Sequence, residues 1–165
     1  MHSTGARPDR AAEAAEHSKY LTFKLADEEY GLEILKVREI IGIMDITSVP
    51  QMPDYVRGVV NLRGRVIPVI DLRLKFGMPA IEYTSETCII VVDGGAPMGV
   101  IVDTVQEVLD IAADQIAPPP PLGKSVQTDF ILGMGKVKEQ IKILVHIDRV
   151  LSDEQICEIQ EASQG

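Results

Sequence analysis

The amino-acid sequence predicts an all-β fold built from two similar halves. Short runs rich in Val and Ile recur along the chain, and turn-forming residues separate them. Hydrophobic residues make up 45% of the 165 residues, whereas aromatic residues make up only 4%. The chain is therefore long and apolar enough for one globular domain, and we expect its core to be aliphatic.

Composition restricts the partners and sites that the chain can have. A formal net charge of −9 disfavours nucleic acid as a partner, because its phosphates would be repelled. Neither Cys88 nor Cys157 has metal-binding spacing, so no metal and no cofactor are expected. No apolar run approaches the ~20 residues of a membrane span, and the first residues lack the apolar stretch of a signal peptide. The expected location is the cytoplasm, without direct membrane insertion.

The first strands follow a polar segment. Residues 1–18 are small and polar, and a flexible tail is expected there. Apolar alternation over residues 21–25 predicts a strand, and residues 30–34 predict its hairpin partner. Residues 36–41 fit either a helix or a strand, and the β-rich context favours a strand.

A second predicted hairpin follows a proline-containing loop. Its strands span residues 57–62 and 65–70, and the turn is centred on residues 63–64. Pro68 lies inside the second strand and cannot donate to a neighbouring strand. An edge position or a bulge is therefore expected at Pro68.

Two short helices are expected next to these strands. Asp71 can cap a helix over residues 72–76, immediately after the second hairpin. Ser152 and Gln155 form a capping-box arrangement, which predicts a C-terminal helix within residues 152–165.

The second half repeats this order of elements. A hairpin turn is expected at residues 93–95, and the four prolines of residues 118–121 predict a stiff polyproline connection. Strands are expected at residues 88–93, 99–103, 105–111, 131–137 and 140–147.

An internal repeat relates the two halves. At an offset of 68 residues Gly31 matches Gly99, and several apolar and acidic positions also match. Five short strands in each half suit a small closed barrel, which removes exposed sheet edges. The expected subdomains are residues 19–82 and 86–151, packed together as two barrels. An exchange of strands between the halves is left open.

Catalytic signatures are missing from the sequence. It has no nucleophile elbow, zinc-protease helix or phosphate-binding loop, and its carboxylates are scattered. His146 lies in an apolar strand, where a solvated or partly packed histidine is simpler than a catalytic base. Several apolar strand residues could face either a partner or the seam between the barrels: Val37, Ile40, Val59, Val100 and Val108.

The run NLRGRVIPVIDLRLKFG resembles the CheW domain, which occurs in chemotaxis coupling proteins and at the C-terminus of CheA kinases. The blocks GLEILKVREIIG, YVRGVVNLRG, MGVIVDTVQEVL and ILGMG extend the resemblance over about residues 19–151. The resemblance implies two five-stranded SH3-like barrels, in agreement with the repeat. The N-terminal tail and the four consecutive prolines depart from the family pattern without touching its motifs.

The resemblance also implies a function and two contact surfaces. A CheW domain is an adaptor, not an enzyme, and couples the cytoplasmic tip of chemoreceptors to the regulatory domain of the CheA histidine kinase at membrane-associated arrays. For kinase contact it indicates Ile34, Val37, Glu39 and Ile40. For receptor contact it indicates Asn61, Arg63, Gly64, Gly99 and Val108.

Three alternatives stay open at the level of the sequence. The chain could serve a non-chemotactic signalling array, or it could be a small-ligand-binding domain with a deep polar pocket. Arg63 could contact the receptor directly or pair with Glu39 inside the molecule. The position of Arg63 at a hairpin tip favours direct contact.

Overall fold

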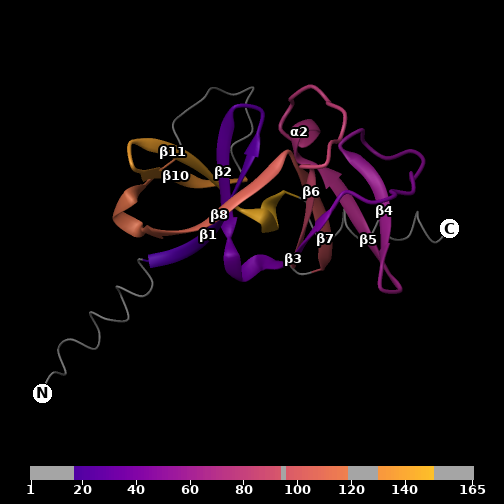
Figure 1. The fold of residues 1–165 in the computed structure, drawn as a ribbon, viewed down its shortest axis with the longest axis horizontal. Coiled ribbons are helices and arrows are strands. Elements are labelled where there is room, and N and C mark those ends of the chain that lie inside the picture. Colours follow the sequence, from indigo (N-terminus) through magenta and orange to yellow (C-terminus); the bar gives the residue numbers. More distant parts are fainter. Residues whose placement is uncertain (1–16, 94–95, 119–129, 151–165) are drawn as a thin grey trace, which may run out of the picture.

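The computed structural model describes residues 17–93, 96–118 and 130–150, which form two β-sheets. Sheet A has six strands in the order β8-β1-β2-β11-β10-β9, and sheet B has five in the order β3-β6-β7-β5-β4. Figure 1 shows the two sheets side by side, with sheet A on the left. The predicted dominance of β-structure is confirmed, whereas the SH3-like barrel stays a prediction.

The strands agree closely with the apolar runs of the sequence. Sheet A consists of β1 (His17–Leu25), β2 (Glu28–Glu33), β8 (Thr104–Ala112), β9 (Ile116–Ala117), β10 (Ile131–Val137) and β11 (Gln140–Val145). Sheet B consists of β3 (Val37–Gly42), β4 (Val56–Leu62), β5 (Arg65–Asp71), β6 (Cys88–Asp93) and β7 (Pro97–Val102).

Short helical segments connect these strands. Helix α2 (Leu72–Lys75) follows β5, and the Asp71 side chain accepts hydrogen bonds from the Arg73 and Leu74 amides, as the sequence predicted. The 3₁₀ turns are η1 (Ile34–Lys36), η2 (Ala113–Gln115) and η3 (Ile147–Arg149). The tail of residues 1–16, the turn at 94–95, the prolines of 119–121 and the C-terminal helix lie outside the described residues.

The chain exchanges strands between the sheets at two corners. β1 and β2 form a hairpin in sheet A, after which η1 leads into β3 at the edge of sheet B. β6 and β7 form a hairpin in sheet B, after which β8 returns to sheet A and pairs with β1. Each sheet therefore combines strands from residues 19–82 and 86–151. The exchange that the sequence left open is present.

The internal repeat is visible in the topology. Sheet order β3-β6-β7-β5-β4 becomes β8-β1-β2-β11-β10 when each strand is replaced by its counterpart in the other half. Gly31 lies opposite Leu144 in one parallel strand pair, and Gly99 lies opposite Val69 in the other. A Cβ added at Gly99 would lie 2.7 Å from Ile89 Cγ2, which is too close. Tight packing therefore explains the glycine at this position of the repeat.

Pro68 does not lie on an edge strand, so the edge alternative was wrong. β5 lies between β4 and β7 in sheet B. Its parallel pairing with β7 begins only at Val69, so the missing N–H of proline costs no bond there. The irregular register occurs on the partner strand instead, between Val56 and Gly58.

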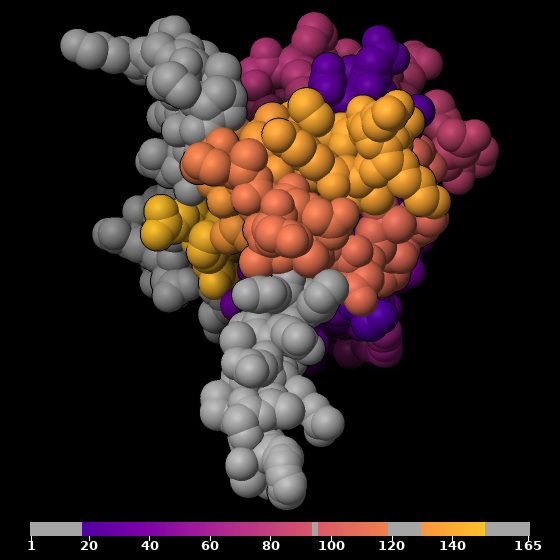
Figure 2. Space-filling view, turned by 90° about the vertical axis from the view of Figure 1, so that its left-hand side faces the viewer, coloured from indigo at the N-terminus to yellow at the C-terminus, as the bar shows by residue number. Residues whose placement is uncertain are grey.

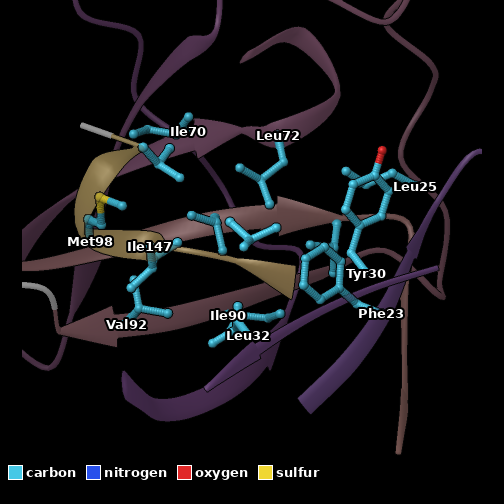
Figure 3. Packing of buried hydrophobic residues seen from close by; sticks show 14 of the residues in the cluster. Phe23, Leu25, Tyr30, Leu32, Ile70, Leu72, Ile90, Val92, Met98 and Ile147 are labelled. Atoms are coloured by element: carbon cyan, nitrogen blue, oxygen red, sulfur yellow. The ribbon is translucent and has the colours of Figure 1, made fainter. Parts of the chain in front are cut away.

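The hydrophobic core passes through the contact between the two sheets. Its main cluster takes Leu25 and Leu32 from sheet A and Ile90 and Val92 from sheet B, and all four side chains are fully buried. Figure 3 shows these side chains converging between the strands. The hydrophobic effect thus holds the sheets together as one unit.

Four of the seven aromatic side chains gather in one row, which the low aromatic content did not predict. Phe23 and Tyr30 stack at 5.7 Å between ring centroids, and Tyr30 lies 5.6 Å from Phe76. Phe76 stacks on Phe130 at 4.3 Å. The row joins β1 and β2 of sheet A to the end of α2 and makes this part of the seam aromatic. Tyr20 is a further buried aromatic residue, in a separate cluster with Ile111 and Leu144.

Ion pairs hold both corners. Asp103 lies between β7 and β8 and accepts hydrogen bonds from Arg73 Nη2 at 2.6 Å and from the Ala26 amide at 2.8 Å. Partial burial by itself would raise the pKa of Asp103, but the hydrogen bonds from Arg73 and Ala26 outweigh it and lower that pKa. At the other corner Lys36 of η1 pairs with Asp148 of η3 at 3.2 Å.

Candidate protein-interaction surface

Strand β3 forms an open edge of sheet B. Within the described part of the chain it pairs only with β6, and a shift in register between Val37 and Glu39 makes Arg38 a bulge residue. Val37 is partly buried and packs against the main core, whereas Ile40 is 43% exposed. Of these two predicted kinase-contact residues, Ile40 is therefore the better exposed.

The β4–β5 hairpin ends in a tight turn that several predicted receptor-contact residues build. Arg63 has φ of 53° and Gly64 has φ of 84°, and two successive positive φ angles are typical of a type I′ turn. The Asn61 side chain accepts a hydrogen bond from the Gly64 amide at 2.9 Å. Asn61 and Gly64 thus shape the turn, and the Arg63 side chain extends from its tip.

Glu39 and Arg63 form an ion pair. Arg63 Nη2 lies 2.7 Å from Glu39 Oε1 and 2.5 Å from Oε2. Glu39 belongs to β3 and Arg63 to the tip of β4–β5, at opposite edges of the curved sheet B. The pair therefore links the two edges and also joins the kinase-contact and receptor-contact groups that the sequence predicted separately. Internal pairing, the alternative left open, is present.

Strand β8 forms the corresponding open edge of sheet A. Val108 pairs with Leu21 of β1, and the Val108 residue is 47% exposed. Figure 2 shows this end of the molecule, where β8, β10 and β11 make up most of the described surface. Val108 and Ile40 are 68 residues apart, so the repeat places one exposed apolar side chain on each open edge.

Two other predicted residues lie inside the molecule. Gly99 is buried between β5 and β6, so any part it has in receptor contact would be indirect. Ile34 is partly buried and packs against the main core. The sequence missed Leu35, which is 91% exposed in η1 directly before β3. A turn of three residues has too little periodicity to reveal its exposed side.

Features of an enzyme or small-ligand site are weak in the described part of the chain. No group of three His, Cys, Asp or Glu side chains among these residues could hold a metal ion. One cleft, of about 500 Å³, is open and is lined in part by Met44, Asp54 and Tyr83. Burial, followed by a hydrogen bond to Asp71, raises the pKa of Tyr83 to about 12, so its phenol stays protonated at neutral pH. No helix in these residues has the length and apolarity to cross a membrane.

Known proteins share both the sequence and the arrangement of the sheets. The family model of the CheW-like domain matches residues 19–155 of this chain. The chain belongs to the CheW-like domain family. The resemblance seen in the sequence is thereby confirmed.

Relatives extend the similarity over almost the whole chain. The chemotaxis protein CheW of Klebsiella aerogenes is 39% identical over 148 residues, which cover 89% of each chain. The chemotaxis protein CheW of Rhizobium meliloti is 34% identical over 136 residues, which cover 82% of this chain and 88% of the relative. The crystal structure of the scaffolding protein TtCheW from Thermoanaerobacter tengcongensis has a TM-score of 0.73 and 39% identity, and covers 78% of this chain and 88% of that one.

Proposed function

We propose that the protein is a non-enzymatic adaptor of bacterial chemotaxis, which couples chemoreceptors to the CheA histidine kinase in the cytoplasm. Support comes from the family membership together with two open sheet edges that each carry an exposed apolar side chain, Ile40 and Val108. An adaptor must hold two partners at once, and two separate edges meet this requirement.

Kinase contact is assigned to β3. Its open edge can accept a partner, and Ile40 supplies an exposed apolar side chain. Ile34 and Val37 lie behind this edge and pack on the core, so they support its position. Glu39 is the acidic residue of this surface, and its charge is already matched by Arg63.

Receptor contact is assigned to the tip of β4–β5 and to β8. Arg63 offers a guanidinium that can hold a carboxylate through two hydrogen bonds. Asn61 and Gly64 fix the turn that presents it. Val108 offers apolar surface on the other sheet, and Gly99 acts only through packing.

Reconstitution from purified parts tests the adaptor function. Kinase autophosphorylation is measured with kinase alone, with kinase and receptor, and with kinase, receptor and this protein. We expect the protein to change kinase output only when both partners are present. Turnover of nucleotide or phosphoprotein by the purified protein alone would contradict the proposal. Sequencing the receptors captured from cell lysate separates a chemotactic array from another signalling array.

A further inference from the structure

We infer that the hollow between β3 and the β4–β5 hairpin receives an acidic side chain of the kinase regulatory domain, and that Arg65 is the residue which binds it. This inference rests on the proposed adaptor function. The hollow, called the arginine pocket below, measures about 270 Å³ and has Arg38, Arg63 and Arg65 among its lining residues.

Local structure explains why these side chains meet. The bulge in β3 brings Arg38 and Glu39 together beside the sheet face that carries Val91. The β4–β5 hairpin reaches over the same face and adds Arg65 at the start of β5. Val91 and Ile67 are buried and form an apolar floor.

The charges of the arginine pocket do not cancel. Arg38 Nη2 lies 2.6 Å from Asp93 Oδ2, and Arg63 is paired with Glu39. Arg65 is exposed and has no charged or hydrogen-bonding side-chain partner among the residues that the structure describes. Three guanidinium groups thus face two carboxylates, which leaves one positive charge in a chain whose net charge is −9.

An acidic side chain fits this environment better than other anions do. The carboxylate would receive two hydrogen bonds from Arg65, and its methylene stem would cover the apolar floor. A polyanion such as nucleic acid would meet the long-range repulsion of the acidic chain, whereas one carboxylate within a protein surface would not. Exclusion of water on docking would strengthen the bond.

The kinase is the favoured source of that side chain. One wall of the arginine pocket is β3, and Ile40 lies two residues beyond Arg38, about 7 Å along the strand. A single partner docked on β3 would therefore cover the exposed Ile40 and reach Arg65 together. The pocket would add charge specificity to an apolar contact.

Titration of the full-length protein against the kinase regulatory domain tests the inference. We expect Arg65→Ala to weaken binding about three- to thirtyfold and Arg65→Glu to weaken it further. Lys136→Ala removes one positive charge from an exposed position on β10 and should leave the affinity unchanged, which makes it the matched control. Arg65→Lys should recover part of the affinity, because it keeps the charge but loses the paired hydrogen bonds.

The outcomes separate this inference from the adaptor function. Equal affinities of the native protein and Arg65→Ala would overturn the role of Arg65 and leave the adaptor function standing. If Arg65→Ala lost receptor binding but kept kinase binding, the inference would also be overturned, because the pocket would then face the receptor. A native protein that binds neither partner would refute the adaptor function itself. Circular dichroism of each variant shows that the fold is retained, and Arg65→Gln replaces any variant that fails to fold.

Discussion

Arg63 occupies a backbone conformation that glycine or asparagine would adopt with less strain. Its φ of 53° lies in the left-handed region, at the first central position of the β4–β5 turn. Its side chain is 64% exposed and that of Glu39 is 33% exposed, so their ion pair contributes only about 0.2–1 kcal/mol to the free energy of unfolding. Stability alone therefore gives little reason for arginine at this position.

Charge reversal at Glu39 and Arg63 separates pairing from receptor contact. Arg63→Glu and Glu39→Arg should each lower the free energy of unfolding by up to about 1 kcal/mol, and the double variant should recover most of that loss. Denaturation in urea measures this coupling.

The receptor gives the second readout of the same variants. Arg63→Glu should lose receptor binding, and the swapped pair should not restore it, because the guanidinium would still be absent from the hairpin tip. Complete recovery of receptor binding in the double variant would assign Arg63 to internal pairing alone.

Ile40 of β3 and Val108 of β8 occupy equivalent places on two edge strands. The same substitution can therefore be compared on the two strands. Ile40→Asp should weaken binding to the kinase regulatory domain at least thirtyfold, since a charge placed in a desolvated contact costs about 2 kcal/mol or more. Val108→Asp should leave kinase binding unchanged and weaken receptor binding. The affinities are measured by titration on variants that keep their fold. If Ile40→Asp weakened receptor binding and Val108→Asp weakened kinase binding, the assignment of the two edges would be reversed.

Val37 is less suited to this test than Ile40. Val37 packs against the main core, so Val37→Asp would weaken kinase binding and also destabilise the fold. An affinity lost at Val37 would therefore have two causes, whereas the partly exposed Ile40 allows a cleaner reading.

Gly99 tests how closely the strands of sheet B must pack. Gly99→Ala should lower the free energy of unfolding by about 1–3 kcal/mol, because the new methyl group meets Ile89 Cγ2 at 2.7 Å. Chemical denaturation measures the loss. Receptor affinity measured on the folded fraction should change little, and a large change with unaltered stability would restore Gly99 to the contact surface.

The whole molecule depends on the two corners at which strands pass between the sheets. The hydrogen bonds that Asp103 accepts from Arg73 and Ala26 fix one corner, and the pair of Lys36 with Asp148 fixes the other. These corners set the separation and orientation of the open edges β3 and β8. The separation of the two open edges therefore depends on polar contacts at Lys36 and Asp103, which lie directly before β3 and β8.

Acid should weaken the Asp103 corner. Its pKa is lower in the folded protein than in the unfolded chain, so its contribution to stability is present at neutral pH. That contribution should be lost as the pH falls below about 4, the usual pKa of an aspartic acid side chain, toward the folded value. Asp103→Asn should destabilise the protein at pH 7 and reduce the dependence of its stability on pH below 5. Thermal unfolding at a series of pH values checks this, and an unchanged pH dependence in the variant would contradict it.

The strands, the turn at residues 63–64 and the repeat follow from the amino-acid sequence. Alternating apolar residues mark strands because successive side chains point to opposite faces, and this pattern is local. The cap at Asp71 and the hairpin turn at residues 63–64 were also predictable, because each depends on residues that are close in the chain. The family resemblance followed from these same blocks.

How those strands combine and which side chains meet depends on the three-dimensional fold. The exchange of strands, the interior place of β5, and the Glu39–Arg63 pair each involve residues that are distant in sequence. A strand pattern specifies two faces but does not say which sheet the strand joins, since either sheet could bury the same apolar face. The arginine pocket forms because the bulge of β3 and the start of β5 lie on one side of the sheet. Its charge balance could not be predicted from the sequence, because electrostatic pairing depends on distance in space.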